Sequence, residues 1–138
     1  MLFDLYHKSK EKENLYILEV NQLKDIVGDR VELVWSEGSG LSQPVGFMNF
    51  PEPEAGKYTY KGYFMQYESE QKVPKLNIDG TEVGYSWQKK HSTVANHFWD
   101  CMNYNVAIRD IFVEAFLKAG KYKDVSWGKF CEVIKSIK

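Results

Sequence analysis

Net charge is nearly absent from this sequence. Its 138 residues include 18 lysines and arginines against 19 aspartates and glutamates, so the formal net charge is −1. A protein so close to neutral has no global positive field that would attract DNA over long distances. Any nucleic-acid-binding function therefore requires a local basic patch or help from another domain. The same balance argues against a polybasic protein that binds membrane surfaces.

Cysteines and long apolar runs are also scarce. Cys101 and Cys131 both lie in segments that are predicted to be amphipathic helices, so we expect two buried free thiols and no disulfide framework. No stretch approaches the roughly 18 consecutive apolar residues of a membrane span. Residues 1–5 lack the basic start and apolar run of a signal peptide. These absences predict a cytoplasmic protein.

A phosphate-binding loop is missing too. Gly38-Ser39-Gly40 is followed neither by Lys-Ser/Thr nor by a predicted helix, so we expect no ATPase motor in this chain. What the sequence does contain is 43% hydrophobic and 15% aromatic residues, enough for a core in one domain of ordinary size. We therefore predict a single domain over residues 1–138.

Hydrophobic periodicity and turn residues predict an α/β fold, with a small mixed sheet and helices packed against it. The predicted elements are a strand at 15–20, a helix at 22–27, an irregular connection at 36–57, a helix at 58–72, strands at 75–78 and 83–88, and helices at 93–117 and 126–137. Asp79-Gly80 is a strong hairpin signal between the two later strands. The strand at 15–20 is almost continuously apolar, which is typical of a strand covered on both faces.

Two predicted helices carry specific expectations about burial. In the helix at 93–117, the spacing predicts that Phe98, Met102, Val106 and Phe112 are buried. In the helix at 58–72, Tyr60, Tyr63, Phe64 and Tyr67 are expected on one side. Tyr58, Tyr60 and Tyr63 could line a surface that contacts DNA, but we expect them to pack against the sheet. Glu68 and Glu70 are two residues apart in that helix, so at most one could face a metal, and we expect both to be solvated.

Asp100 is the most suggestive acidic residue. It lies near the start of an apolar helix, where the helix dipole favours a carboxylate. Carboxylate oxygens are also the ligands that Mg²⁺ prefers. If Asp100 holds a metal, it should be partly open to solvent and have no strong Lys or Arg partner. The alternative is a solvated or capping acid, or one bridged to a lysine.

Four segments together resemble one protein family. Residues 96–107 read Asn-His-Phe-Trp-Asp-Cys-Met-Asn-Tyr-Asn-Val-Ala, which is similar to the last motif of the nuclease domain in lambda-type terminase large subunits of tailed phages. Three earlier segments resemble the same family in the same order, namely residues 18–25, 46–51 and 63–70. The resemblance covers about residues 15–117.

The resemblance implies part of an RNase H-like fold and a DNA endonuclease that cuts phage DNA during genome packaging. It implies that Asp100 is a catalytic ligand for Mg²⁺ or Mn²⁺, with His97 and Lys89 in supporting roles. Lys89 and Lys90 are the expected contacts to double-stranded DNA. The family's earlier catalytic acids have no counterpart here, so we expect a C-terminal nuclease segment that is inactive without the remainder of the terminase and its packaging machinery.

Two other functions stay open at this stage. The chain could be a non-catalytic interaction domain or prophage remnant, with the tyrosine-rich stretch and the Gly/Pro-rich loop as its interface. His97 and Cys101 also have the i, i+4 spacing of a helical zinc site, although no further ligands support it.

Overall fold

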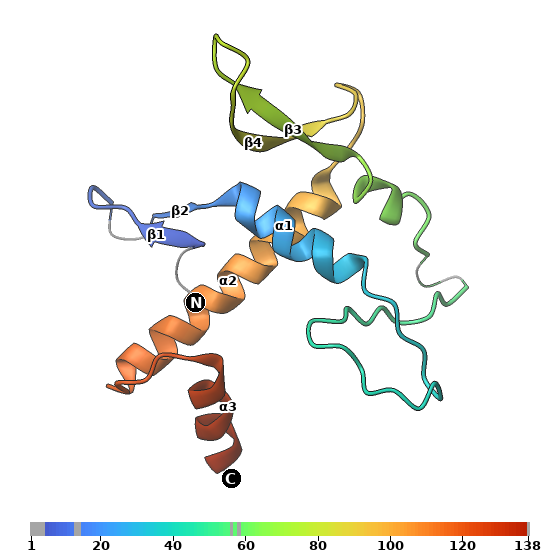
Figure 1. The fold of residues 1–138 in the computed structure, drawn as a ribbon. Coiled ribbons are helices and arrows are strands. Elements are labelled where there is room, and N and C mark those ends of the chain that lie inside the picture. The colour runs from blue at the N-terminus through green and yellow to red at the C-terminus, as the bar shows by residue number, and fades with distance from the viewer. Residues whose placement is uncertain (1–4, 13–14, 56, 58, 138) are drawn as a thin grey trace. The chain divides into compact units, whose positions relative to one another are not determined.

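The computed structural model describes residues 5–12, 15–55, 57 and 59–137. The elements in chain order are β1 (Tyr6–Lys8), β2 (Tyr16–Leu18), α1 (Val20–Val31), the short 3-10 helix η1 (Phe64–Gln66), β3 (Glu70–Leu76), β4 (Glu82–Lys89), α2 (His97–Ala119) and α3 (Trp127–Ser136) (Figure 1). The α/β prediction is confirmed. In the described residues, however, the strands form two separate antiparallel pairs, β1 with β2 and β3 with β4, where one mixed sheet was expected.

The chain divides into two compact units. The described residues within 1–23 and 103–138 form the first unit, and those within 24–102 form the second. Both α1 and α2 supply residues to each unit. No helix in the described part of the chain is both long and apolar enough to cross a membrane.

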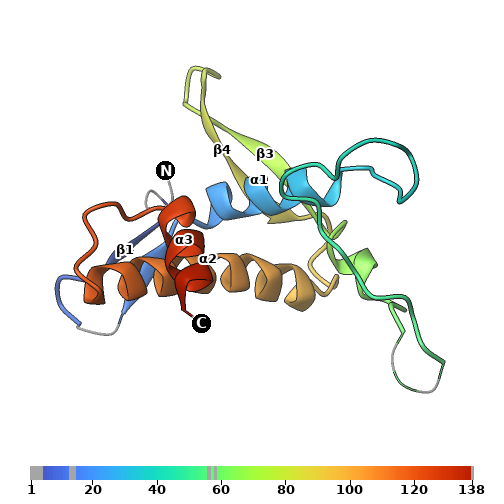
Figure 2. The same ribbon diagram turned by 90° about the horizontal axis from the view of Figure 1, so that it is seen from below.

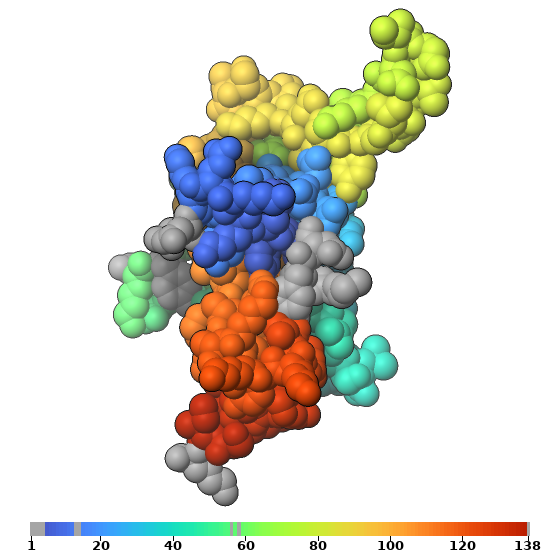
Figure 3. Space-filling view, turned by 90° about the vertical axis from the view of Figure 1, so that its left-hand side faces the viewer, coloured from blue at the N-terminus to red at the C-terminus, as the bar shows by residue number. Residues whose placement is uncertain are grey.

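The strand expected at 15–20 is short and exposed. β2 pairs with β1 in a register that places Lys8 opposite Tyr16 and Tyr6 opposite Leu18. Ile17 is 46% exposed, so the prediction of a strand covered on both faces is wrong. In the space-filling view the β1–β2 hairpin, in dark blue, lies at the surface (Figure 3). The apolar run of residues 15–20 indicates a strand, but it does not reveal how many layers cover that strand.

The long helix α2 forms where it was predicted, but it buries a different face. It begins at His97 because residues 91–95 form a turn, and it ends just before Gly120. Phe98 and Phe112 are 44% and 58% exposed, so the expectation that both are buried is wrong, whereas Val106 is buried. Buried positions recur every three or four residues at Trp99, Asn103, Val106, Asp110, Val113 and Leu117, and Ala107 is buried beside Val106.

Two polar residues explain why the sequence pointed to the wrong face. Asn103 and Asp110 lie on the buried stripe and interrupt its apolar pattern. Arg109, the neighbour of Asp110, forms an ion pair with it at 3.0 Å. Phe112 is not isolated, because its ring packs edge-on against Phe130 of α3 at 6.2 Å. Phe112 on the outer face therefore contacts α3.

The helix α3 confirms its prediction. Ser126 caps it, with its Oγ accepting a hydrogen bond from the backbone N–H of Lys129 at 3.2 Å. Cys131 in this helix is exposed, as is Cys101 in α2, so the expectation of two buried thiols is wrong.

The first part of the second unit is α1, which continues through Gly28. A Cβ atom at Gly28 would lie 3.8 Å from the indole of Trp99 and 3.9 Å from that of Trp87. The missing side chain lets both aromatic rings approach the helix backbone closely. The helix therefore runs beyond its predicted end at residue 27, and Gly28 lies where the indoles pack against it.

The β3–β4 hairpin is confirmed, with a turn in which Asp79 accepts a hydrogen bond from the backbone N–H of Thr81 at 2.9 Å. The helix expected at 58–72 is wrong. Among the described residues of this stretch only η1 is helical, and the chain enters β3 at Glu70. Tertiary pairing with β4 outweighs the local helical pattern at residues 70–72.

The connection between α1 and β3 is long and irregular, as expected (Figure 1, Figure 2). It is held together by aromatic rings instead of regular structure. Phe50 packs edge-on against Tyr60, Tyr63 and Phe64 at ring-centroid distances of 6.1, 6.2 and 5.0 Å. Tyr63 also stacks near Phe98, the second residue of α2, at 5.0 Å. These rings pack mainly on one another, where packing against the sheet was expected. Tyr58 lies outside the described residues.

Candidate active site

Asp100 lies in the first turn of α2, and two polar contacts define where that turn begins. The carbonyl oxygen of Asn96 accepts the first helical hydrogen bond from the N–H of Asp100 at 2.9 Å. The side-chain oxygen of Gln66, on η1, accepts a hydrogen bond from the N–H of Phe98 at 2.9 Å. One of the otherwise unpaired N–H groups of the helix start is thereby satisfied. The irregular connection and η1 thus help to fix the position of Asp100.

The carboxylate of Asp100 converges with that of Glu70 on a single ammonium group. Lys24 Nζ lies 2.5 Å from Glu70 Oε2 and 3.3 Å from Asp100 Oδ1. The side chains of Lys24 and Glu70 are only 8% and 3% exposed, whereas that of Asp100 is 29% exposed. Burial of a charge is costly unless it is paired, so these ionic groups depend on one another.

Asn96 also forms hydrogen bonds with both carboxylates, at the oxygens that do not face Lys24. Its Nδ2 donates to Glu70 Oε1 at 2.7 Å and to Asp100 Oδ2 at 2.9 Å. Each carboxylate therefore has one oxygen on the lysine and the other on the asparagine. We call Lys24, Glu70, Asn96 and Asp100 the acid-pair cluster. Two acids against one lysine leave it with a formal charge of −1.

The cluster corrects two expectations. Asp100 is partly open to solvent as predicted, but the expectation that it lacks a Lys or Arg partner is wrong, because Lys24 is within ion-pair distance. Glu70 was expected to be solvated and is instead buried at the start of β3, while Glu68 is exposed as predicted. Because residue 70 begins a strand, the side chain of Glu70 points inward. The prediction of a helix at 58–72 could not identify this orientation.

Asp25, next to Lys24 on α1, ties the helix to the β3–β4 hairpin. Its carboxylate accepts hydrogen bonds from Trp87 Nε1 at 2.8 Å and from the Tyr85 hydroxyl, and Lys72 Nζ lies 2.8 Å away. Burial opposes the ionisation of Asp25, but the three hydrogen bonds and the charge of Lys72 outweigh it and lower the pKa of this carboxyl. Asp25 therefore has a structural role next to Lys24 of the cluster.

The other residues proposed from the sequence lie around this region. Lys89 is the cross-strand partner of Glu70, and Lys90 donates its backbone N–H to Ser69 at 2.9 Å. Both lysines and His97 are exposed. A pocket of about 320 Å³ has Lys90 and Glu70 in its lining, together with Trp87 and Trp99. No cluster of three or more His, Cys, Asp or Glu suited to a metal is present among the described residues, including around His97 and Cys101.

Carboxylates are hard ligands of the kind that Mg²⁺ and Mn²⁺ accept, and Mg²⁺ commonly uses one or two of them while keeping several waters. The ammonium group of Lys24 already lies between the two acids, and Asn96 faces both of them with its Nδ2, which is a donor and not a metal ligand. Glu70 and Asp100 are therefore the two residues of the cluster that could hold a divalent ion, in competition with Lys24.

Three members of the cluster were not identified as site residues from the sequence. Lys24 and Asn96 lie within the segments that resemble the terminase family, and Glu70 ends another. Their position in those segments was the available signal. Their convergence depends on contacts between residues 26 and 46 positions apart in the chain.

Comparison with known proteins identifies a family for most of the chain. The family model described as terminase large subunit gpA, endonuclease domain, matches residues 4–118. No curated protein and no solved structure gave a significant match to the chain. The matched region contains all four residues of the acid-pair cluster and most of the chain, and the chain therefore belongs to the family of terminase large subunit endonuclease domains.

Proposed function

We propose that this chain is the C-terminal portion of a metal-dependent DNA endonuclease, which cuts phage DNA during genome packaging in the host cytoplasm. Membership of the terminase endonuclease family supports the reaction class. The observation that carries the proposal is the acid-pair cluster, in which the carboxylates of Glu70 and Asp100 converge on one cation. The arrangement is proposed to be part of an RNase H-like nuclease fold.

Glu70 and Asp100 would hold Mg²⁺ or Mn²⁺, and the ion would activate water and stabilise charge at the phosphate. Asn96 keeps both carboxylates oriented through its two hydrogen bonds. Lys24 balances the buried charge when the ion is absent. His97 and Lys89 are proposed as supporting residues only, since both are exposed near the acid-pair cluster.

Lys89 and Lys90 are proposed to contact the phosphates of double-stranded DNA. Their exposed side chains follow the strand that pairs with Glu70, so a bound backbone would run past the acidic residues. Phosphate contacts of this kind position DNA without reading its sequence. The remainder of a terminase large subunit and the packaging machinery are the proposed protein partners.

A metal titration tests the central step. In NMR spectra of the chain, Mn²⁺ should broaden the amide signals of residues 96–101 and 70 before those of other residues, because a paramagnetic ion relaxes nearby nuclei. Asp100→Asn should remove this selective broadening, and Asp124→Asn, a change in an exposed acid elsewhere, should leave it intact. Broadening that avoids residues 70 and 96–101 would refute the metal-binding role.

A further inference from the structure

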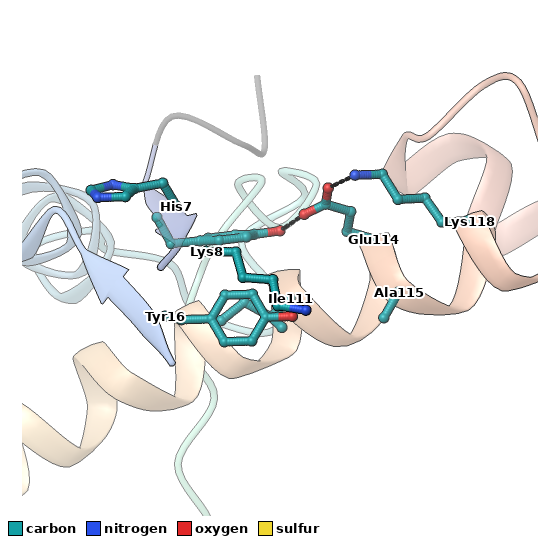
Figure 4. A pocket seen from close by; sticks show the side chains of 8 residues that line it. His7, Lys8, Tyr16, Ile111, Glu114, Ala115 and Lys118 are labelled. Carbon is teal, nitrogen blue, oxygen red and sulfur yellow. Dashed lines mark hydrogen bonds and ion pairs between the residues drawn. The ribbon is translucent and has the colours of Figure 1, made fainter. Parts of the chain in front are cut away.

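A second pocket lies in the first unit, and none of its lining residues belongs to the acid-pair cluster. It has a volume of about 420 Å³ and is lined by residues of β1, β2 and α2, namely Tyr6, His7, Lys8, Tyr16, Ile111, Glu114, Ala115 and Lys118 (Figure 4). This volume falls in the range of sites that bind small molecules. The function proposed above leaves this pocket unused.

Tyrosine rings form the walls of the pocket. Tyr6 is buried, and its hydroxyl donates a hydrogen bond to Glu114. Burial and the neighbouring Glu114 carboxylate raise the pKa of Tyr6, which keeps its phenol protonated as a donor. Tyr16 packs edge-on against Tyr6 at 5.9 Å and is 37% exposed. Tyr6 is therefore the fixed wall, and Tyr16 offers ring surface to a ligand.

Lysines line the rim. Lys8 is the cross-strand partner of Tyr16, and directly opposed residues in an antiparallel pair project on the same face. Lys118 reaches toward Glu114 from the next turn of α2, as Figure 4 shows. Within the described residues no ion pair of Lys8 is found, so the lysines exceed the single acid of the pocket by one charge. His7 turns away from Glu114 in the same view.

We propose that this pocket binds one nucleotide of a DNA strand, with the base against Tyr16 and the phosphate between Lys8 and Lys118. The choice of DNA as the source of the nucleotide rests on the proposed nuclease function. The chemistry itself comes from the pocket, since an aromatic face beside lysines is how proteins hold single strands without reading sequence. The pocket also supplies a local basic site, which a chain of net charge −1 needs in order to bind DNA.

The proposal predicts a specific pattern of binding losses. Binding of a fluorescein-labelled oligothymidylate to the full chain, followed by anisotropy, should weaken by about 5- to 150-fold in Tyr16→Ala, the range measured for loss of one stacked base. Tyr16→Phe should bind like the unchanged protein, because it keeps the ring. Lys8→Ala should lower the slope of log affinity against log salt by about 0.7, as expected for one lost phosphate contact on a single strand.

Matched controls come from the same hairpin. Ile17→Ala removes an exposed side chain from the opposite face of β2, and Lys10→Ala removes an exposed lysine that does not line the pocket. Both should leave binding unchanged, and circular dichroism should show every variant folded. Equal losses in Tyr16→Ala and Ile17→Ala would overturn the proposal, as would an absence of oligonucleotide binding. Neither result bears on Mn²⁺ binding at Asp100, so this site and the proposed metal site are tested separately.

Discussion

Lys24 supplies the positive charge of the acid-pair cluster. Its ammonium group lies 2.5 Å from the buried carboxylate of Glu70 and also reaches Asp100. Removal of one partner from a buried ion pair leaves an uncompensated charge, which costs far more than the pair itself contributes. The same reasoning distinguishes Asp100 from Lys24, because Asp100 is partly solvated and its loss leaves the Lys24–Glu70 pair intact.

Lys24→Met should therefore lower the free energy of unfolding by about 3–5 kcal/mol, as in other broken buried pairs. Asp100→Asn should change it by no more than about 1 kcal/mol, the value typical of a solvated pair. Urea denaturation followed by circular dichroism measures both. The double variant Lys24→Met/Glu70→Leu should recover most of the loss, since the one charge left without the lysine, on Asp100, is partly solvated. A Lys24→Met variant as stable as the unchanged protein would contradict the ion-pair argument.

Asp25 should make stability depend on pH in the acid range. Its pKa is lowered in the folded protein, so its stabilising effect is present above the unfolded value of about 3.9 and is lost as pH falls through the folded value. The difference in unfolding free energy between the unchanged protein and Asp25→Asn should be large near neutral pH and shrink below about pH 4. Urea melts across this range measure it. Asp124→Asn, an exposed control, should show no such convergence.

At the scale of elements, α1 packs against the indole rings of Trp87 and Trp99 at Gly28. Gly28 has no positive φ and lies inside the helix, where glycine is less favourable than alanine by about 0.5–1 kcal/mol. A Cβ atom there would meet Trp99 at 3.8 Å and Trp87 at 3.9 Å, which is ordinary van der Waals contact. Space exists for a methyl group but not for a larger side chain.

Gly28→Ala should accordingly raise the midpoint of thermal unfolding, with a gain of about 0.5–1 kcal/mol in stability. Gly28→Leu should lower it, because the longer side chain would force the indoles apart. Differential scanning calorimetry of the two variants checks both directions. A loss of stability in Gly28→Ala would show that the indole packing is tighter than the structure indicates.

The buried face of α2 supports a further test. Leu117 is fully buried and Ile108 is 62% exposed, although both are large apolar residues of the same helix. Leu117→Ala should cost about 2–5 kcal/mol through the lost contacts and the cavity that remains. Ile108→Ala should cost well under half as much, because it removes a mostly solvated side chain. Equal losses in urea melts would contradict the observed orientation of the helix.

At the scale of the whole molecule, the number of converging acids limits what the chain can do alone. Two-metal cleavage of DNA requires several carboxylates to hold two ions about 3.5–4 Å apart. In the described residues the cluster provides two, Glu70 and Asp100, and one lysine already neutralises part of their charge. One metal ion is the most that this cluster can support.

The isolated chain should therefore fail to cleave DNA with either Mg²⁺ or Mn²⁺. Conversion of supercoiled plasmid to its nicked form, followed on agarose gels, measures this. Robust nicking that disappears in Asp100→Ala would show a complete active site and refute the proposed dependence on further terminase segments. Nicking that persists in Asp100→Ala would instead identify a contaminating nuclease.

Local sequence signals determined several features by themselves. The Asp79-Gly80 turn, the extent of α3 and the end of α2 at Gly120 follow from residues within a few positions of each feature. The motif around Asp100 likewise indicated the nuclease family, and the family match over residues 4–118 agrees. Signals of this kind act through turn geometry, capping and short-range spacing, so no knowledge of the tertiary structure is needed.

Only the tertiary structure decided which residues share a site and which faces are buried. Glu70 meets Lys24 across 46 positions and Asn96 across 26, and no local period encodes such pairs. Asn103 and Asp110 lie on the buried stripe of α2, which made the outer aromatic face the more regular pattern in sequence. Residues 70–72 became a strand because pairing with β4 satisfies their backbone groups. Burial and pairing depend on partners distant in the chain, and local propensity yields to them.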